Sequence, residues 1–154
     1  MKSNKIAWIS LLLWGATIAV FGWFFVRGNT TAGTDHRTAI VLQSGERELV
    51  LSEMRSLLAA VHGILEGANQ GDRNRIVKSS RSAGLGMAVD ENPLLMAKLP
   101  LAFKTLGLSV HREMDELANA AEGGKPVPEL LTMAANTLAK CVACHAAWQI
   151  KAGG

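Results

Sequence analysis

Residues 139–150 read AKCVACHAAWQI and contain both cysteines of the chain. Around this stretch the inward positions recur at alternating intervals of three and four, which is typical of a helix face that packs in a bundle. The positions on this face are Leu131, Ala134, Leu138, Cys141, His145 and Trp148. We therefore expect a long helix that begins near Pro128 and carries both cysteines and His145 toward its C-terminal end.

The spacing of Cys141, Cys144 and His145 is a signature of covalent haem attachment. Two thiols three residues apart can add to the two vinyl groups of a porphyrin, and the histidine that follows can bind the iron as its proximal ligand. The sequence therefore predicts one haem c, attached through Cys141 and Cys144, with His145 as an axial ligand of the iron.

Two other uses of a Cys-x-x-Cys pair fit the sequence less well. A structural zinc site needs two further ligands, and there is no second Cys-x-x-Cys or His-x-x-x-His motif to supply them. A redox dithiol would lie near a helix N-terminus within a strand–helix pattern, where the helix dipole lowers the thiol pKa. This pair lies late in its expected helix, so haem attachment is favoured.

An apolar segment precedes the rest of the chain. Residues 6–26, IAWISLLLWGATIAVFGWFFV, carry no charge and are long enough as a helix to cross the roughly 30 Å core of a bilayer. Lys2 and Lys5 favour an N-terminus in the cytoplasm and a domain outside it. We predict that residues 1–27 anchor the chain in the lipid of a bacterial inner (cytoplasmic) membrane, as a single pass, with the domain in the periplasm. A cleaved signal peptide is the alternative, but the bulky GWFFVRG is a poor cleavage site.

Four helical stretches are expected after a short polar linker at residues 28–37. Gly71 and Asp72 separate the first two stretches, and GGKPVP separates the last two, while strand signals are weak or absent. The predicted fold of residues 38–154 is all-α, an antiparallel four-helix bundle preceded by a single transmembrane helix. The stretches are residues 39–68, 72–86, 100–122 and 128 onward, with a looser connection at 87–99.

The net charge of +3 excludes few functions, but its distribution is informative. No dense basic stripe is interleaved with aromatic residues, so the sequence does not predict a nucleic-acid-binding protein. The most basic segment lies in the second expected helix, where a solvated face is favoured over a docking patch for an acidic partner. Its cations are Arg73, Arg75, Lys78 and Arg81.

A four-helix bundle with CVACH on its last helix resembles the class II c-type cytochromes, the cytochrome c-prime family. The resemblance covers residues 38–152. It implies that Cys141 and Cys144 are the thioether cysteines and that His145 is the axial histidine. Members often carry an aromatic residue and an arginine after that histidine. Trp148 matches the aromatic residue, but Gln149 stands where arginine is common, which leaves Arg55 or Lys151 as candidates to contact a haem propionate.

The opposite side of the iron separates two branches of this family. High-spin members have an apolar residue over an empty distal site, whereas low-spin members have a methionine on the first helix, followed by a basic residue. The stretch SEMRSLL places Met54 before Arg55, which resembles the low-spin pattern. Met54 also shares the apolar helix face of Leu57, Leu58 and Val61, although methionine at such spacing is often core filler.

We therefore expect Met54 as the distal iron ligand, with a pocket wall formed by Leu57, Leu58, Phe103 and Trp148. His62 lies at the edge of the apolar stripe and is a less favoured ligand, and His111 is expected at the boundary of the core.

Two functions follow from these expectations. Ligation by histidine and methionine saturates the iron and favours electron transfer to or from a redox partner protein. A five-coordinate haem would instead bind or sense NO or CO. We expect no enzymatic activity, because the sequence reveals no acid–base pair or distal polar group near the haem other than His62. Family members are often dimers through their first two helices, which the resemblance leaves open for this chain.

Overall fold

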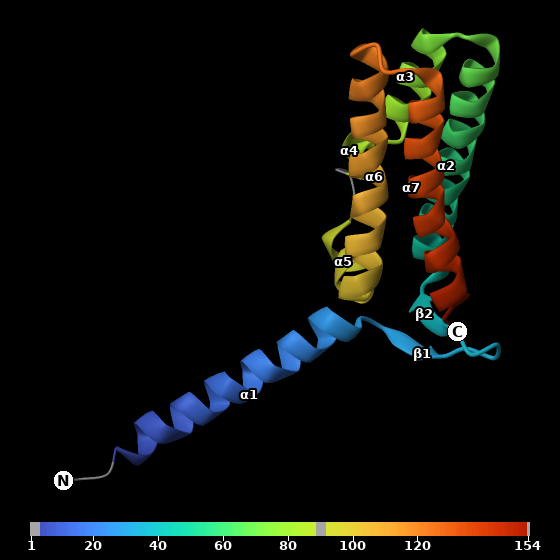
Figure 1. The fold of residues 1–154 in the computed structure, drawn as a ribbon. Coiled ribbons are helices and arrows are strands. Elements are labelled where there is room, and N and C mark those ends of the chain that lie inside the picture. The colour runs from blue at the N-terminus through green and yellow to red at the C-terminus, as the bar shows by residue number, and fades with distance from the viewer. Residues whose placement is uncertain (1–3, 89–91, 154) are drawn as a thin grey trace.

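The computed structural model describes residues 4–88 and 92–153, and this part of the chain is mostly helical. Helix α1 stands apart from a compact group of helices, and a small sheet lies at their junction (Figure 1). In chain order the elements are α1 (Lys5–Arg27), β1 (Thr30–Ala32), β2 (Thr38–Leu42), α2 (Ser44–Gln70), α3 (Arg73–Ser82), α4 (Leu85–Ala88), α5 (Pro93–Lys98), α6 (Leu101–Glu122), α7 (Val127–Ala147) and β3 (Trp148–Ala152).

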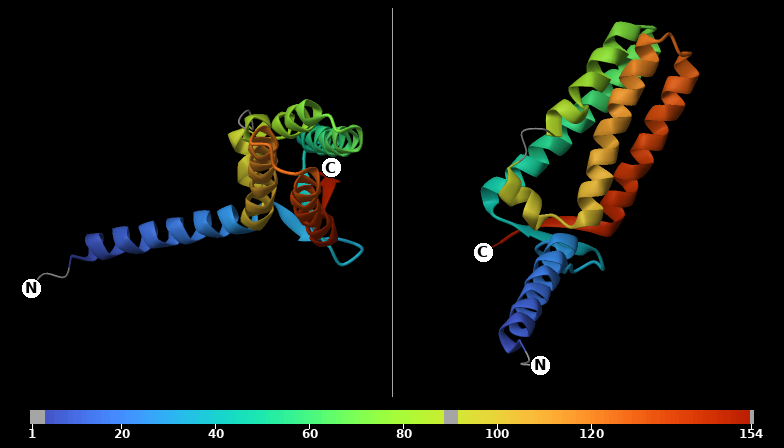
Figure 2. Two further views of the ribbon diagram at one scale, coloured as in Figure 1. Left: turned by 45° about the horizontal axis from the view of Figure 1, so that its top comes forward. Right: turned by 90° about the vertical axis from the view of Figure 1, so that its left-hand side faces the viewer.

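Helix α1 is long and apolar enough to cross a membrane, as expected for residues 6–26. None of its residues is buried against the rest of the chain. Figure 2 shows it running away from the end of the domain at which α5 and the start of α6 lie.

Helices α2, α3, α6 and α7 lie side by side and alternate in direction (Figure 1). The signals that end one helix and begin the next act as predicted. Gly71 adopts the left-handed conformation (φ 68°) that ends α2, and the Asp72 side chain accepts a hydrogen bond from the backbone N–H of Arg75 to begin α3. Pro100 directly precedes α6. Pro126 directly precedes α7, which therefore begins at Val127, one residue before the start expected near Pro128.

The second expected helix is shorter than predicted. α3 ends at Ser82, α4 spans the end of the second expected helix and the start of the expected connection, and α5 lies within that connection. Residues 89–91 of the expected connection lie outside the described residues.

The expectation of a purely helical chain is wrong in one respect, because three strands form a sheet in the order β1–β2–β3. β1 lies within the expected linker and pairs with β2 in antiparallel fashion, and β2 pairs in parallel with β3. The first long helix therefore begins at Ser44, not at residue 39, and Trp148 opens a strand where the sequence predicted a helix. β2 and β3 pair across more than a hundred residues, from Thr38 to Trp148, so no local pattern predicts that pairing.

Two groups of buried side chains form the core. One lies among α2, α3, α6 and α7 and contains Ala60, Ile64, Ile76, Ala83, Met114, Leu117, Ala121, Leu130 and Ala134. The other joins the sheet to α2 and α5 and contains Ile40, Leu42, Val50, Leu95 and Leu99. The cavity described next is lined by residues that border the first group, such as Leu57 and Val61, and by residues that border the second, such as Met54 and Phe103.

Candidate functional site

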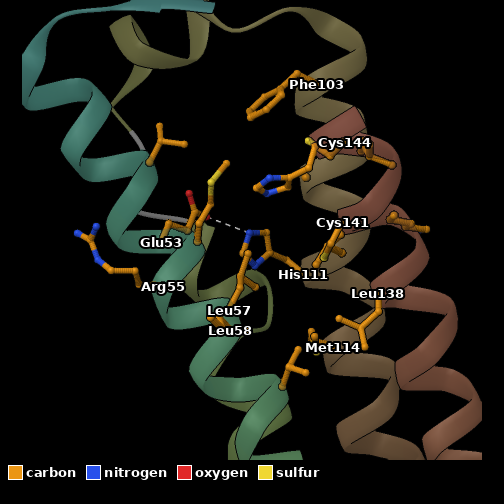
Figure 3. A pocket seen from close by; sticks show the side chains of 18 of the residues that line it. Glu53, Arg55, Leu57, Leu58, Phe103, His111, Met114, Leu138, Cys141 and Cys144 are labelled. Atoms are coloured by element: carbon orange, nitrogen blue, oxygen red, sulfur yellow. Dashed lines mark ion pairs between the residues drawn. The ribbon is translucent and has the colours of Figure 1, made fainter. Parts of the chain in front are cut away.

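A cavity of about 500 Å³ lies between α2, α6 and α7 (Figure 3). This volume falls within the range of about 300–1,000 Å³ that is usual for cofactor sites. Its lining is mainly apolar and consists of Val50, Leu51, Glu53, Met54, Arg55, Leu57, Leu58, Val61, Phe103, Leu106, Gly107, Val110, His111, Met114, Leu138, Lys140, Cys141, Cys144 and His145. The structure thus brings seven of the eight residues predicted for the haem site to one cavity.

The α7 wall carries the Cys141, Cys144 and His145 side chains. All three belong to one continuous helix, in which residues three and four apart lie on the same side. Both thiols are free and partly buried. Burial raises the pKa of both the Cys141 and the Cys144 thiol. A dithiol built for redox exchange has the opposite property, a lowered pKa.

The α2 wall faces these groups with Met54, Leu57, Leu58 and Val61. Met54 is partly buried and packs against the core group that joins the sheet to α2 and α5. Leu58 is 69% exposed and therefore lies at the rim of the cavity. The thioether expected as a distal ligand and the imidazole expected as the proximal one thus line the same space.

Trp148 lines a second, smaller cavity of about 140 Å³. Met54, Phe103, Cys144 and His145 line both cavities, which are therefore neighbours. The Trp148 ring meets the Phe103 ring edge-on, with centroids 5.8 Å apart and an angle of 89° between the planes. Trp148 lies near the expected site as the first residue of β3, not as part of a helix.

Arg37 is a site residue that the sequence reasoning missed. Its guanidinium donates hydrogen bonds to the backbone carbonyl oxygens of His145 (3.1 Å) and Trp148 (3.5 Å), at the C-terminal end of α7. The same guanidinium donates two hydrogen bonds to the Asp35 carboxylate, at 2.6 and 2.8 Å. These hydrogen bonds lower the pKa of the Asp35 carboxyl. Asp35 also accepts a hydrogen bond from the Gln149 side chain at 3.0 Å. The turn between β1 and β2 therefore fixes the backbone that carries His145.

Arg55 and Lys151, the propionate candidates, are both exposed. Arg55 lines the larger cavity and lies 3.9 Å from Glu48, a weak surface pairing. Lys151 is not among the described residues that line either cavity, whereas Arg37 lines the smaller one.

A histidine–glutamate pair, with a buried His111 and a partly exposed Glu53, also lines the larger cavity, although the sequence revealed no acid–base pair. His111 is 4% exposed, so the prediction of a boundary position is wrong. Its Nδ1 lies 2.8 Å from the Ala83 carbonyl oxygen, and its Nε2 lies 2.9 Å from Glu53 Oε1. The dashed line in Figure 3 marks the His111–Glu53 pair. Because a carbonyl oxygen only accepts, the Ala83 contact requires a proton on Nδ1, and the Nε2 contact with Glu53 is an ion pair when the ring is protonated.

The signal for this pair was faint in the sequence. Glu53 precedes Met54 on the edge of the apolar face of α2, and His111 follows the inward Val110 on α6. Only the tertiary structure, which places α2 and α6 on two walls of one cavity, brings the two side chains together.

Lys140 precedes Cys141 and is held by an ion pair and a hydrogen bond. Its ammonium group donates to Glu113 at 2.6 Å and to the Ser109 hydroxyl at 2.8 Å. Thr137 donates to the other Glu113 oxygen at 2.9 Å. This network joins α6 to α7 at the edge of the cavity and neutralises the lysine.

The remaining polar candidates lie elsewhere. His62 is 77% exposed at its side chain, 3.6 Å from Glu66, and is not among the described residues that line either cavity. Three of the four cations of the basic segment contact acceptors in the same chain: Arg73 contacts backbone oxygens, Arg75 pairs with Glu66, and Arg81 pairs with Asp115 and Glu122. No group of three or more histidine, cysteine or acidic side chains suited to a metal ion occurs within residues 4–88 and 92–153.

The arrangement fits a flat, largely apolar group held covalently at one wall. Two thiols and an imidazole stand on α7, a thioether stands on α2, and apolar side chains make up most of the remaining lining. Comparisons with protein-family models, curated proteins and solved structures gave no match to this chain.

Proposed function

We propose that this chain is a membrane-anchored, monohaem c-type cytochrome that carries electrons on the periplasmic side of a bacterial inner membrane. The observation that carries the proposal is one apolar cavity lined by Cys141, Cys144 and His145 on α7 and by Met54 on α2. The alternating directions of the main helices support a four-helix bundle of the cytochrome c-prime kind, with α3, α4 and α5 in place of one continuous second helix.

Each site residue has a definite task in this proposal. Cys141 and Cys144 would hold the haem through thioether bonds, His145 would bind the iron from α7, and Met54 would bind it from α2. The haem supplies reversible one-electron chemistry at iron. Phe103, Leu57 and Leu58 would exclude water from the porphyrin faces, and a dry, low-dielectric setting tunes the reduction potential.

The position of Met54 favours electron transfer over gas binding. A thioether on the wall opposite His145 can occupy the sixth iron position, which discourages small ligands and raises the reduction potential. A five-coordinate haem that binds or senses NO or CO is the alternative. It requires Met54 to act only as packing, and the partly buried position of its side chain among apolar neighbours is compatible with that role as well.

The anchor adds a kinetic argument for electron transfer. A chain held in the membrane by α1 has a raised effective concentration for redox proteins in the same membrane. The redox partner is thus expected to be another protein at the periplasmic surface.

The first experiment is an optical spectrum of the purified full-length protein, oxidised and reduced, with CO added to the reduced form. A low-spin spectrum that CO leaves unchanged is expected for the electron carrier. Met54→Leu should then convert the spectrum to high-spin and allow CO to bind. Met133→Leu is the matched control, because Met133 lies on α7 outside the described lining of both cavities.

Two results would count against the proposal in different ways. A high-spin native spectrum that shifts with CO would favour the gas-binding alternative. A protein that loses its colour completely on denaturing extraction would have no covalent haem, and the assignment of Cys141 and Cys144 would fail.

A further inference from the structure

The junction between α1 and the domain is a packed contact. Gly28 is buried with a φ of 64°, and a Cβ at this position would lie 2.5 Å from the Lys98 carbonyl oxygen and 2.6 Å from the Pro100 nitrogen. Only glycine combines that backbone conformation with so close an approach. The backbone directly after α1 therefore packs closely against the segment that joins α5 to α6.

Hydrogen bonds fix the residue that follows. The Asn29 N–H donates to the Lys98 carbonyl oxygen at 2.7 Å, and its side-chain amide donates to the Val41 carbonyl oxygen at 2.8 Å. The Val41 N–H in turn donates to the Asn29 carbonyl oxygen at 2.9 Å. Asn29 thus joins the end of α1 to both the α5–α6 corner and β2, so no free spacer separates the anchor from the domain.

A second contact lies one helical turn into α6. The Lys104 ammonium group lies 4.2 Å from the centroid of the Phe25 ring, a cation–π distance, and donates a hydrogen bond to the Met96 carbonyl oxygen at 3.1 Å. Phe25 belongs to the last turn of α1. If α1 spans a bilayer, α5 and the first turns of α6 are therefore the part of the domain nearest to the lipid.

The outward face at this corner carries leucines and cations. Leu94 on α5 is 72% exposed, and Leu101 and Leu108 on α6 are each 37% exposed. Leu101, Leu108 and the exposed Arg112 lie seven and four residues apart, on the side of α6 opposite to the cavity-lining Phe103 and Val110.

The charges on this face change with distance from α1. Among the described residues, neither Lys104 nor Arg112 pairs with a carboxylate. The acidic side chains of α6 come later, at Glu113, Asp115, Glu116 and Glu122. The end of α6 next to the anchor is thus apolar and basic, which is the pattern of a helix that lies in the interface of an anionic membrane.

We propose that the outer face of α5 and the first three turns of α6, with Leu94, Leu101, Leu108, Lys104 and Arg112, docks on the bilayer surface and binds the phosphates of anionic lipids. This inference rests on the proposed membrane anchor. The cavity-lining side of α6 faces the opposite way, so docking turns the haem site toward the periplasm and away from the lipid.

The test uses the full-length protein in vesicles and a single new cysteine. Leu108→Cys reports on the proposed face, and Leu131→Cys is the matched control, because Leu131 is also 37% exposed but lies near the start of α7, at the end of the domain far from α1 (Figure 1). The measurement is the rate at which a water-soluble maleimide modifies each cysteine. Vesicles of phosphatidylcholine are compared with vesicles that also contain phosphatidylglycerol.

Docking predicts that anionic vesicles slow the modification of Leu108→Cys and leave Leu131→Cys unchanged. Replacing Lys104 and Arg112 together by glutamate should restore the rate, with a change of roughly tenfold or more in the docking equilibrium. Equal rates at Leu108→Cys in both vesicles would overturn the inference. Protection that rises with protein concentration in detergent would assign the face to a second copy of the chain and overturn it as well.

The same samples separate this inference from the proposed function. Co-flotation with vesicles reports on the anchor, and the optical spectrum reports on the haem. Protection of Leu108→Cys in a protein without haem would sustain the docking surface while the cytochrome proposal fails. A chain that does not float with vesicles would overturn both the anchor and the docking surface.

Discussion

The two halves of the helical group differ in how closely their helices approach. In the half far from α1, Gly63 and Gly67 let α2 lie directly against α3: a Cβ on Gly67 would lie 2.9 Å from Ile76 Cγ1, and one on Gly63 would collide with Ser79. In the half near α1, α2 and α7 stand apart, and leucine, methionine and phenylalanine side chains surround a cavity. Small residues close one half of the group, and large apolar residues surround an opening in the other.

This difference indicates where the fold depends on a cofactor. The half far from α1, here called the closed half, buries Ile64, Ile76 and Leu117 almost completely without a cofactor. The half near α1, here called the open half, leaves Met54, Leu57 and Val61 only partly buried. If a haem completes the second half, its removal should loosen that half and spare the first.

The largest effect should come from removing the attachment site. Replacing Cys141 and Cys144 together by serine should abolish covalent haem, and amide hydrogen exchange should then speed up in residues 50–61 while the helices around Ile76 and Leu117 stay protected. Mass spectrometry of the intact protein and exchange of the purified variant measure both outcomes. Uniform loss of protection would show that the two halves do not differ in this way.

The next largest effect compares the two halves by truncating one apolar side chain in each and measuring the loss of stability with and without haem. Ile64→Ala should cost about 2–5 kcal/mol in the free energy of unfolding, with or without haem, because Ile64 is 1% exposed in the closed half. Leu57→Ala should cost about 1 kcal/mol more in the haem-containing protein than in the double-serine variant, because Leu57 lines the cavity. Chemical denaturation in detergent micelles measures these differences, and an equal cost of Leu57→Ala in both forms would contradict the expected role of the haem.

A smaller effect is expected at the His111–Glu53 pair between the halves. His111→Leu should cost about 1–3 kcal/mol, because the Glu53 carboxyl and the Ala83 carbonyl oxygen both lose a hydrogen-bonding partner. Glu53→Gln is the milder control, since the amide can still hydrogen-bond to the imidazole. Chemical denaturation of both variants in detergent micelles measures the change in the free energy of unfolding. A neutral His111→Leu would mean that water or another group satisfies these atoms.

The smallest effect is on the stability of the protein in acid, and it comes from Asp35 in the turn between β1 and β2. The pKa of Asp35 is lowered in the folded protein by its hydrogen bond to Arg37. Its contribution to stability is therefore complete above the pKa of the unfolded chain and is lost as the pH falls through the lower, folded value. Asp35→Asn should therefore lower the stability slightly at neutral pH, where the carboxylate contribution is complete, and flatten part of the loss of stability below about pH 4. Glu46, whose pKa Lys98 lowers in the same way, remains in the variant, so some acid dependence persists.

Much of the helical layout was predictable because its signals are local. Gly71 and Asp72 end and begin helices through their own backbone and side-chain geometry, and the prolines before α6 and α7 act through a fixed φ. The spacing of Cys141, Cys144 and His145 likewise predicts that they share one helix side. The apolar periodicity around Met54 placed that residue on the inner face of α2 in the same manner.

Only the tertiary structure decided the features that join distant segments. Sequence patterns gave no hint that Thr38 pairs with Trp148, that Arg37 holds the end of α7, or that Glu53 meets His111 inside the cavity. Each of these contacts joins residues more than fifty positions apart. Periodicity and capping report the conformation of a few neighbouring residues, whereas such contacts depend on how whole helices and strands pack against one another.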